Sequence, residues 1–347
     1  MQGSPAFLDP LDALLTPPSR TEYRLALAIP TSGQLGLTAP ASLAAAELAA
    51  AEVNAAGGIF GREVSLVLVD AGGSPSAVQE QIRDLVQARA VEAVVGFHTS
   101  DVHRAIERET AGRVPYLFTP PHEGGTRLPG VGLLGPSPRQ QLAPALAALG
   151  GTAGRRWVLL GNDYIWPRRV HAAAATMIPA SGGDIVDSIF VPFGELHPDA
   201  LIARIAKQRP DFVLLSLVGR DLATFNRAWA SSHMRGRVGR VCAALDETGL
   251  LEINGDDSGE LFTSMDWFAT DTDDGFLDRY RARWGSLAPT PGVYARGCYD
   301  GLHAAVRLVP PHADALPEFG HRVAVRPRPK VRLAMADGTR LVALGRH

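Results

Sequence analysis

Residues 53–64, with the sequence VNAAGGIFGREV, constrain the fold of this chain more than any other segment. Gly57 and Gly58 follow an Ala-rich stretch, and glycine most easily takes the left-handed conformation with which many helices end. Gly61 then permits a tight turn, and the apolar run 65–70 (SLVLVD) is typical of a buried strand. The segment therefore predicts a helix-to-strand joint of a parallel sheet.

The segments on either side of this joint complete a repeating unit. A strand is predicted at 23–30, a polar glycine-containing loop at 31–36 and a helix at 39–55. A second helix at 76–88 leads into another strand at 91–96. This β-α-β-α-β order has the spacing that a doubly wound parallel sheet requires.

Four motifs connect the chain to a known family. They are PTSG at 30–33, the helix through 46–54, NAAGGIFGR at 54–62, and GNDYIWPR at 161–168. With them the chain resembles the type I periplasmic-binding-protein fold, in the branch that binds small amides, urea and branched-chain amino acids. The last motif is similar to a segment of the amide-sensing negative regulator of aliphatic amidase operons and of urea-binding transporter proteins. The resemblance runs from about residue 23 to about 308.

The resemblance implies an α/β protein with two doubly wound parallel-sheet lobes, joined by a multi-crossing hinge around a ligand cleft. We expect an extended leader at 1–21. Segments 132–138 and 260–265 are interpreted as crossings between the lobes. The predicted lobe boundaries are 22–135 plus about 266–308 for lobe 1, and 136–265 plus about 309–347 for lobe 2.

Composition limits the partners. With 46% hydrophobic and 20% charged residues and a net charge of −2, the chain is typical of a soluble globular protein, and nothing demands nucleic acid or an anionic membrane. No run is long and apolar enough for a membrane span. Cys242 and Cys298 are expected to be buried free thiols, and no spacing indicates a metal or a cofactor. The first residues lack the pattern of a secretion signal, which predicts a cytoplasmic protein, or an exported one if the true start lies upstream.

Residues that directly follow strands are the candidate ligand contacts, because ligands of open parallel sheets lie at the carboxyl ends of strands. In the loop after strand 91–96, Ser100 could cap the next helix, or its hydroxyl could bind a carbonyl or carboxylate. The resemblance implies ligand contact for Ser100. Thr99 and His98 are included as candidates, although a packing or solvated histidine is the alternative for His98.

A second loop contains Phe118, Thr119 and Pro120. The amide sensors have a tyrosine at the place of Phe118 and a threonine at that of Pro120, so this wall has lost two hydroxyl groups, and Thr119 could supply one. The departure predicts a ligand that is bulkier or less polar than acetamide.

Two candidates lie in the predicted second lobe. Tyr164 matches the ligand-stacking tyrosine of the family, although a tyrosine after a strand can also simply pack. Asp246 could accept a hydrogen bond from an amide nitrogen, or it could cap the next helix or lie in solvent.

An enzyme is not predicted. The sequence has no Gly-x-Ser-x-Gly elbow, no phosphate loop and no His-Glu-x-x-His helix. Ser100 with His98 or His103 is a nominal pair, but a third orienting group is missing from the pattern. The Pro-rich leader cannot form a helix-turn-helix.

Two binding functions remain. In the first, a small amide, urea or amino acid closes the lobes of a sensor that regulates a protein partner, as the resembled regulator does with an RNA-binding antiterminator. In the alternative, the chain is the substrate-binding component of an ABC transporter. The leader favours the sensor, and a homodimer is left open. Residues 310–347 are interpreted as a solvated strand-and-turn tail that finishes lobe 2, with a basic docking surface as the alternative.

Overall fold

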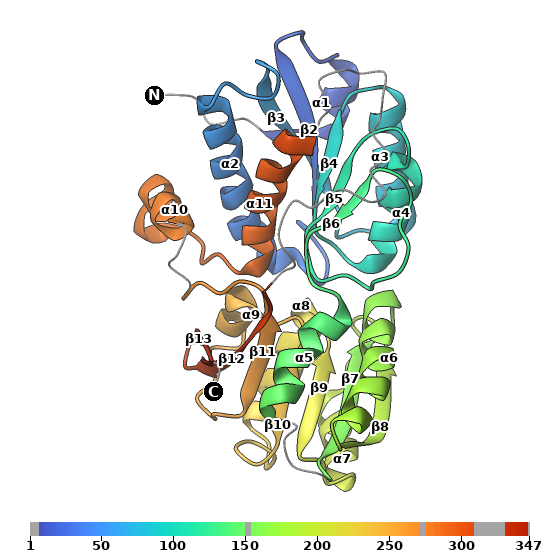
Figure 1. Cartoon of the computed structure of the whole chain (residues 1–347), viewed down its shortest axis with the longest axis vertical. Coiled ribbons are helices and arrows are strands. Elements are labelled where there is room, and N and C mark those ends of the chain that lie inside the picture. Colours follow the sequence, from blue (N-terminus) through green and yellow to red (C-terminus); the bar gives the residue numbers. More distant parts are fainter. Residues whose placement is uncertain (1–6, 150–153, 271–274, 309–329, 346–347) are drawn as a thin grey trace. The chain divides into compact units, whose positions relative to one another are not determined.

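The computed structural model describes residues 7–149, 154–270, 275–308 and 330–345. The chain forms two compact units, and the element labels below are those of Figure 1. Unit 1 takes residues 1–120, 125–135 and 275–327, and unit 2 takes residues 121–124, 136–274 and 328–347. Two α/β units with parallel sheets confirm the predicted fold class. Residues 266–270, which we expected in lobe 1, belong to unit 2.

Unit 1 is built on a six-stranded parallel sheet in the order β1-β3-β2-β4-β5-β6. Its strands are β1 (Phe7–Leu8), β2 (Glu22–Ile29), β3 (Glu63–Asp70), β4 (Ala93–Gly96), β5 (Tyr116–Phe118) and β6 (Val131–Leu133). Its helices are α1 (Pro10–Leu15), α2 (Ala39–Ala55), α3 (Pro75–Gln87), α4 (Ser100–Thr110), α10 (Phe276–Trp284) and α11 (Val293–Leu308), with short 3-10 turns at Gly36–Thr38 and Gly285–Leu287.

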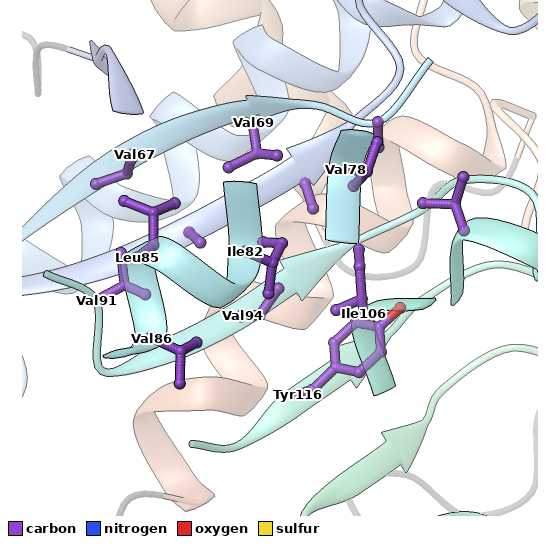
Figure 2. Close-up of a cluster of buried hydrophobic side chains, with 14 of the residues drawn as sticks. Val67, Val69, Val78, Ile82, Leu85, Val86, Val91, Val94, Ile106 and Tyr116 are labelled. Atoms are coloured by element: carbon purple, nitrogen blue, oxygen red, sulfur yellow. The ribbon is translucent and has the colours of Figure 1, made fainter. Parts of the chain in front are cut away.

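One face of this sheet carries a well-defined hydrophobic core, shown in Figure 2. Ile82 and Leu85 of α3 and Ile106 of α4 have no exposed surface and pack on Val67 and Val94 of the strands. The strands read as almost continuous apolar runs because helices cover both faces of the sheet. On the other face, α11 approaches β4 and β5 closely, since a Cβ at Gly301 would lie 2.6 Å from Val95 Cγ1.

The helix-to-strand joint at 53–64 forms as predicted. Helix α2 ends at Ala55, and Gly57 and Gly58 take positive φ angles of 101° and 72°. Gly58 is required, because a Cβ there would lie 2.0 Å from the Arg62 carbonyl oxygen. The Asn54 side chain holds the joint to the start of β3 by donating to the Val64 carbonyl and accepting from the Val64 amide.

The segment expected to be an extended leader is instead part of unit 1 within its described residues, 7–21. Phe7–Leu8 pairs in parallel with β3, and α1 begins with Asp9 accepting a hydrogen bond from the Leu11 amide. Ala13 is buried in the hydrophobic core cluster that also contains Val67 and Val69. The sequence prediction was wrong because the segment is short, and its strand gains its hydrogen bonds only from a distant partner.

Unit 2 has a seven-stranded sheet in the order β13-β12-β11-β10-β9-β7-β8. Strands β7 (Arg156–Asn162), β8 (Asp184–Val191), β9 (Phe212–Ser216), β10 (Gly239–Cys242) and β11 (Leu261–Met265) are parallel, whereas β12 (Arg332–Asp337) and β13 (Arg340–Ala343) add antiparallel. The helices are α5 (Pro138–Leu149), α6 (Ile165–Ala180), α7 (Pro198–Lys207), α8 (Gly219–Ala230) and α9 (Glu247–Glu252).

One of the two predicted crossings is confirmed and the other is wrong. Segment 132–138 begins in β6 of unit 1 and passes into unit 2 between Gly135 and Pro136. Leu261–Met265, in contrast, is an interior strand of unit 2. Short apolar runs with glycines do not distinguish a strand from a connection.

The terminal strands β12 and β13 confirm a strand-and-turn tail in unit 2, but Leu333, Ala334 and Ala336 are buried in the sheet rather than solvated. Residues 310–329 lie outside the described residues. A docking role for this tail stays a prediction.

Both cysteines are buried and free, as expected. Within the described ranges, no helix combines the length and the apolar character needed to cross a membrane. The same ranges bring together no group of three histidine, cysteine or acidic residues that could hold a metal ion.

Candidate functional site

Each sheet has a topological switch point, which is a strand whose two neighbours follow it in the chain but lie on opposite sides of it. In unit 1, β2 lies between β3 and β4, and in unit 2, β7 lies between β8 and β9. Ligands of doubly wound sheets bind outside the carboxyl ends of the strands at such points. The loop after β4 carries His98, Thr99 and Ser100, and the loop after β7 carries Tyr164. Two of the predicted loops therefore lie at switch points.

His98 is part of a buried hydrogen-bonded group in unit 1. Its Nε2 lies 3.0 Å from the hydroxyl of Tyr116, and that hydroxyl lies 2.8 Å from Nδ1 of His103. His98 Nδ1 lies 3.2 Å from the Thr99 carbonyl oxygen. Burial lowers the pKa of His98 from 6.5 to about 4, so the imidazole is neutral at physiological pH.

Phe118 is packed within the same group. Its ring centroid lies 4.1 Å from that of His103, in a stacked geometry, and 5.0 Å from that of His98. Phe118 is 1% exposed. The structure therefore brings His98 and Phe118 together, and it favours the packing interpretation of His98.

The start of helix α4 differs from the predicted capping arrangement. The N-cap residue is Thr99, whose side chain makes no capping hydrogen bond, and Ser100 is the first helical residue. Ser100 is 3% exposed. Capping by Ser100 is thus wrong, because the residue lies inside the helix, and its predicted ligand contact stays a prediction.

Thr119 and Pro120 follow β5 and are both buried. The Thr119 hydroxyl donates to the Gly96 carbonyl over 3.2 Å, and its amide donates to the same oxygen over 3.0 Å. Thr119 also faces helix α11, since a Cβ at Gly297 would lie 3.0 Å from Thr119 Oγ1. The Thr119 hydroxyl, which could replace one of the two lost hydroxyl groups, therefore donates to a hydrogen bond that holds β4 and β5 together.

Tyr164 is the N-cap residue of α6 and is 7% exposed. Its ring lies 5.0 Å from Phe193 and 6.4 Å from Trp166, so it belongs to an aromatic group. Asn162, just before it, binds the neighbouring loop: its Nδ2 donates to Asp221 Oδ2 over 2.7 Å and its Oδ1 accepts the Val218 amide. This pair fixes the loops after β7 and β9 against each other.

Asp246 follows β10 and is 3% exposed. Its Oδ1 accepts the Gly249 amide over 3.0 Å as the N-cap of α9, which confirms the capping interpretation. Its Oδ2 is buried and has no hydrogen-bond partner among the described residues. Burial raises the pKa of Asp246 from 3.8 to about 6. A buried acceptor without a partner is costly unless something else binds it.

The sequence analysis did not identify three residues that contact the candidate residues at the carboxyl ends of the strands. Tyr116 joins the two histidines, Asp221 anchors Asn162, and Phe193 packs on Tyr164. A signal existed for Tyr116, because it lies two residues before Phe118 on one strand, and such residues share a face of the sheet. Asp221 and Phe193 become neighbours of these residues only through the pairing of distant strands.

Unit 2 also holds a buried histidine, His171, that was not predicted. His171 of α6 places Nδ1 2.9 Å from the Ser188 hydroxyl and Nε2 3.1 Å from the Ser216 hydroxyl. Burial lowers the pKa of His171 from 6.5 to about 4, with a smaller contribution from Arg168. A base this weak is poorly suited to activating a serine near neutral pH.

A profile of the periplasmic binding protein family matches residues 22–311. The chain belongs to this family. The periplasmic binding protein fold is also that of three solved structures, two solute-binding proteins and one transporter substrate-binding protein. A solute-binding protein of an ABC transporter from R. palustris, in complex with benzoate, has a TM-score of 0.74 at 19% identity, covering 93% of this chain and 96% of that one.

A second R. palustris solute-binding protein, in complex with 4-hydroxybenzoate, has a TM-score of 0.79 at 15% identity, with 94% and 96% of the two chains covered. The branched-chain amino acid transporter substrate-binding protein LivJ from Streptococcus pneumoniae, in complex with isoleucine, has a TM-score of 0.72 at 16% identity, with 93% and 99% covered. At these identities the likeness shows the fold of a periplasmic binding protein. The amide-sensing branch stays a prediction.

Proposed function

We propose that this periplasmic binding protein is the substrate-binding component of an ABC transporter for a small polar organic molecule. The observation that carries the proposal is the family match, which spans both units. The three solved structures that share the fold over nearly the whole chain are substrate-binding proteins of transporters or solute-binding proteins. The sensor acting on an RNA-binding partner has no such support and remains an untested prediction.

The chemistry of Asp246 narrows the ligand. Its Oδ2 can accept a hydrogen bond from an ammonium, amide or hydroxyl group, and Oδ1 is already used by the Gly249 amide. A ligand that supplies such a donor would satisfy the buried oxygen. The other candidates, Ser100, Thr99 and Tyr164, lie at the carboxyl ends of β4 and β7.

Isothermal titration of the full chain with acetamide, urea, isoleucine, benzoate and 4-hydroxybenzoate tests the proposal. We expect saturable binding of at least one compound that carries a donor group. If none of the five binds, and the folded chain is confirmed by circular dichroism, the proposal for this ligand class is wrong.

The variant Asp246→Asn keeps a good N-cap but removes the charge. We expect it to weaken a donor-bearing ligand at least about tenfold, since hydrogen bonds to charged groups contribute about 1.5–3 kcal/mol. Asp257→Asn is the matched control, because the Asp257 side chain is 76% exposed and pairs with Arg235 at the surface. Equal affinities of wild type and Asp246→Asn would exclude Asp246 from the ligand site.

A further inference from the structure

The hydroxyl of Tyr116 has a position that constrains two histidines at once. It lies 2.8 Å from His103 Nδ1 and 3.0 Å from His98 Nε2, and all three side chains are buried. A phenolic hydroxyl has one proton, so it can donate to one imidazole nitrogen and must accept from the other. The two histidines therefore cannot choose their tautomers independently.

The Thr99 carbonyl decides the direction of these bonds. His98 Nδ1 lies 3.2 Å from the Thr99 carbonyl oxygen, which can only accept. Nδ1 of His98 must then carry the proton, and its Nε2 accepts from the Tyr116 hydroxyl. The Tyr116 oxygen in turn accepts from Nδ1–H of His103. His98 is thus neutral with its proton on Nδ1, and His103 also carries a proton on Nδ1.

The bonds close into a ring through the backbone. The Thr99 carbonyl that accepts from His98 also accepts the His103 amide over 2.9 Å. The ring runs from Tyr116 through His98 and the Thr99 carbonyl to His103 and back to Tyr116. Ser100, the candidate ligand contact, lies on the backbone between Thr99 and His103, inside the segment that this ring fixes.

We propose that Tyr116 is a positioning residue: its hydroxyl links His103 to His98, whose tautomer the Thr99 carbonyl sets, and the resulting hydrogen bonds fix the Thr99–Ser100 segment for ligand binding. The ligand part rests on the proposed function. The role differs from simple core packing, because a phenylalanine at 116 would fill the same space and lose the ring of hydrogen bonds.

The test compares Tyr116→Phe with Tyr23→Phe. Tyr23 lies on β2 of the same unit, is 1% exposed, and its hydroxyl has no hydrogen-bond partner among the described residues. Both variants remove one buried hydroxyl from one sheet, and only the first breaks the ring. Tyr23→Phe therefore controls for the loss of a hydroxyl from the core.

The first readout is the ¹⁵N spectrum of the imidazoles near pH 7, without ligand. In wild type and Tyr23→Phe we expect His98 and His103 to show a protonated Nδ1 and an unprotonated Nε2. In Tyr116→Phe, we expect His98 to keep its proton on Nδ1, because the Thr99 carbonyl still accepts it, and His103, whose Nδ1–H has lost its acceptor, to populate both tautomers. A wild-type His98 protonated on Nε2, or a His103 tautomer unchanged in Tyr116→Phe, would overturn the inference, and the first of these needs no variant to fold.

The second readout is affinity for the tightest binder among the five compounds of the titration. We expect Tyr116→Phe to bind it about tenfold more weakly, and Tyr23→Phe to stay within about twofold of wild type. A tautomer change without a loss of affinity would refute the ligand part of the inference. Absence of binding by wild type would count against the proposed function, while the spectra still decide the role of Tyr116.

Discussion

Unit 1 and unit 2 each bury a neutral histidine against hydroxyl groups, but the order of the partners is opposite. In unit 1, one hydroxyl lies between two imidazoles: Tyr116 between His98 and His103. In unit 2, one imidazole lies between two hydroxyls: His171 between Ser188 and Ser216. An imidazole with one donor and one acceptor nitrogen can serve two serines, just as a hydroxyl can serve two histidines.

The two hydrogen-bonded groups differ in the solvent exposure of their side chains. All three side chains of the unit 1 group are buried, and Phe118 stacks on His103. In unit 2, Ser216 is fully buried, whereas Ser188 is exposed on the edge strand β8. The unit 1 group is therefore held from both sides, while water can replace one partner in unit 2. Substitutions next to the histidines, and acid, should therefore destabilise unit 1 more than unit 2.

The largest effect is expected for Gly96→Ala in unit 1. Gly96 ends β4 directly before the His98 loop, and a Cβ there would lie 1.9 Å from the Ala28 carbonyl oxygen. Backbone cannot move aside as a side chain can, so we expect a loss of about 3 kcal/mol or more in the free energy of unfolding. Urea unfolding of the full chain measures it.

Gly161→Ala is the counterpart in unit 2 and should cost less, about 1–2 kcal/mol. Its Cβ would lie 2.3 Å from Ser216 Oγ and 3.2 Å from His171 Nε2, which are side-chain atoms. Gly73→Ala is the control, because its Cβ would have nothing within 4 Å. If Gly161→Ala destabilises the chain as much as Gly96→Ala, the distinction between backbone and side-chain obstacles is wrong.

Acid should destabilise unit 1 more than unit 2. The pKa of His98 and of His171 is lowered to about 4 from 6.5, so each neutral imidazole contributes stability above pH 6.5 that is lost as the pH falls through 6.5 toward 4. At pH 4.5 each loss is about 2.5 kcal/mol. The pKa of Asp246 is raised to about 6, so protonation of this carboxyl offsets about 2 kcal/mol in unit 2 alone.

Hydrogen exchange with mass spectrometry at pH 7.5 and pH 4.5, corrected for intrinsic rates, reports on each unit separately. We expect peptides of β4 and β5 to lose more protection than peptides of β9 and β10. The variant Asp246→Asn lacks the carboxyl whose protonation offsets the cost of protonating His171. In this variant we expect the two units to lose protection equally at pH 4.5. Substitution of His233, which is exposed, is the control. Equal acid sensitivity of the two units in wild type would contradict the prediction.

The comparison also shows what the sequence could predict. The joint at 53–64, the helices and the parallel strands follow from local patterns, because helix ends and buried strands have signals within a few residues. The candidate loops followed from strand ends alone. The Tyr116 ring and the His171 group were beyond reach, since Tyr116 lies 18 residues from His98 and Ser216 lies 45 residues from His171. Such contacts depend on strand order and register, which local patterns do not fix.

The same reason explains what the structure adds to the expectations and where it corrects them. The ligand contact of Thr119 stays a prediction, and the parallel register of β4 and β5 adds a hydrogen bond from its hydroxyl to the Gly96 carbonyl. The leader was read as extended because its partner, β3, begins more than fifty residues later. Asp246 was predicted as a ligand contact, a helix cap or a solvated residue. One of its oxygens caps α9 and the side chain is buried rather than solvated, while ligand contact through the other oxygen stays a prediction.

The smallest effects on stability are expected for the two serines that contact His171 in unit 2, and they should differ between the two positions. The Ser216 hydroxyl donates to the Leu160 carbonyl oxygen, so it accepts from Nε2–H of His171. Ser216→Ala leaves this buried N–H without its acceptor, which should cost about 2 kcal/mol in the free energy of unfolding. Ser188→Ala should cost less than about 0.5 kcal/mol, because Ser188 is exposed and water can donate to Nδ1 in its place. Urea unfolding at pH 7.5 measures both changes. A loss for Ser188→Ala as large as that for Ser216→Ala would mean that the unit 2 group is held from both sides, as the unit 1 group is.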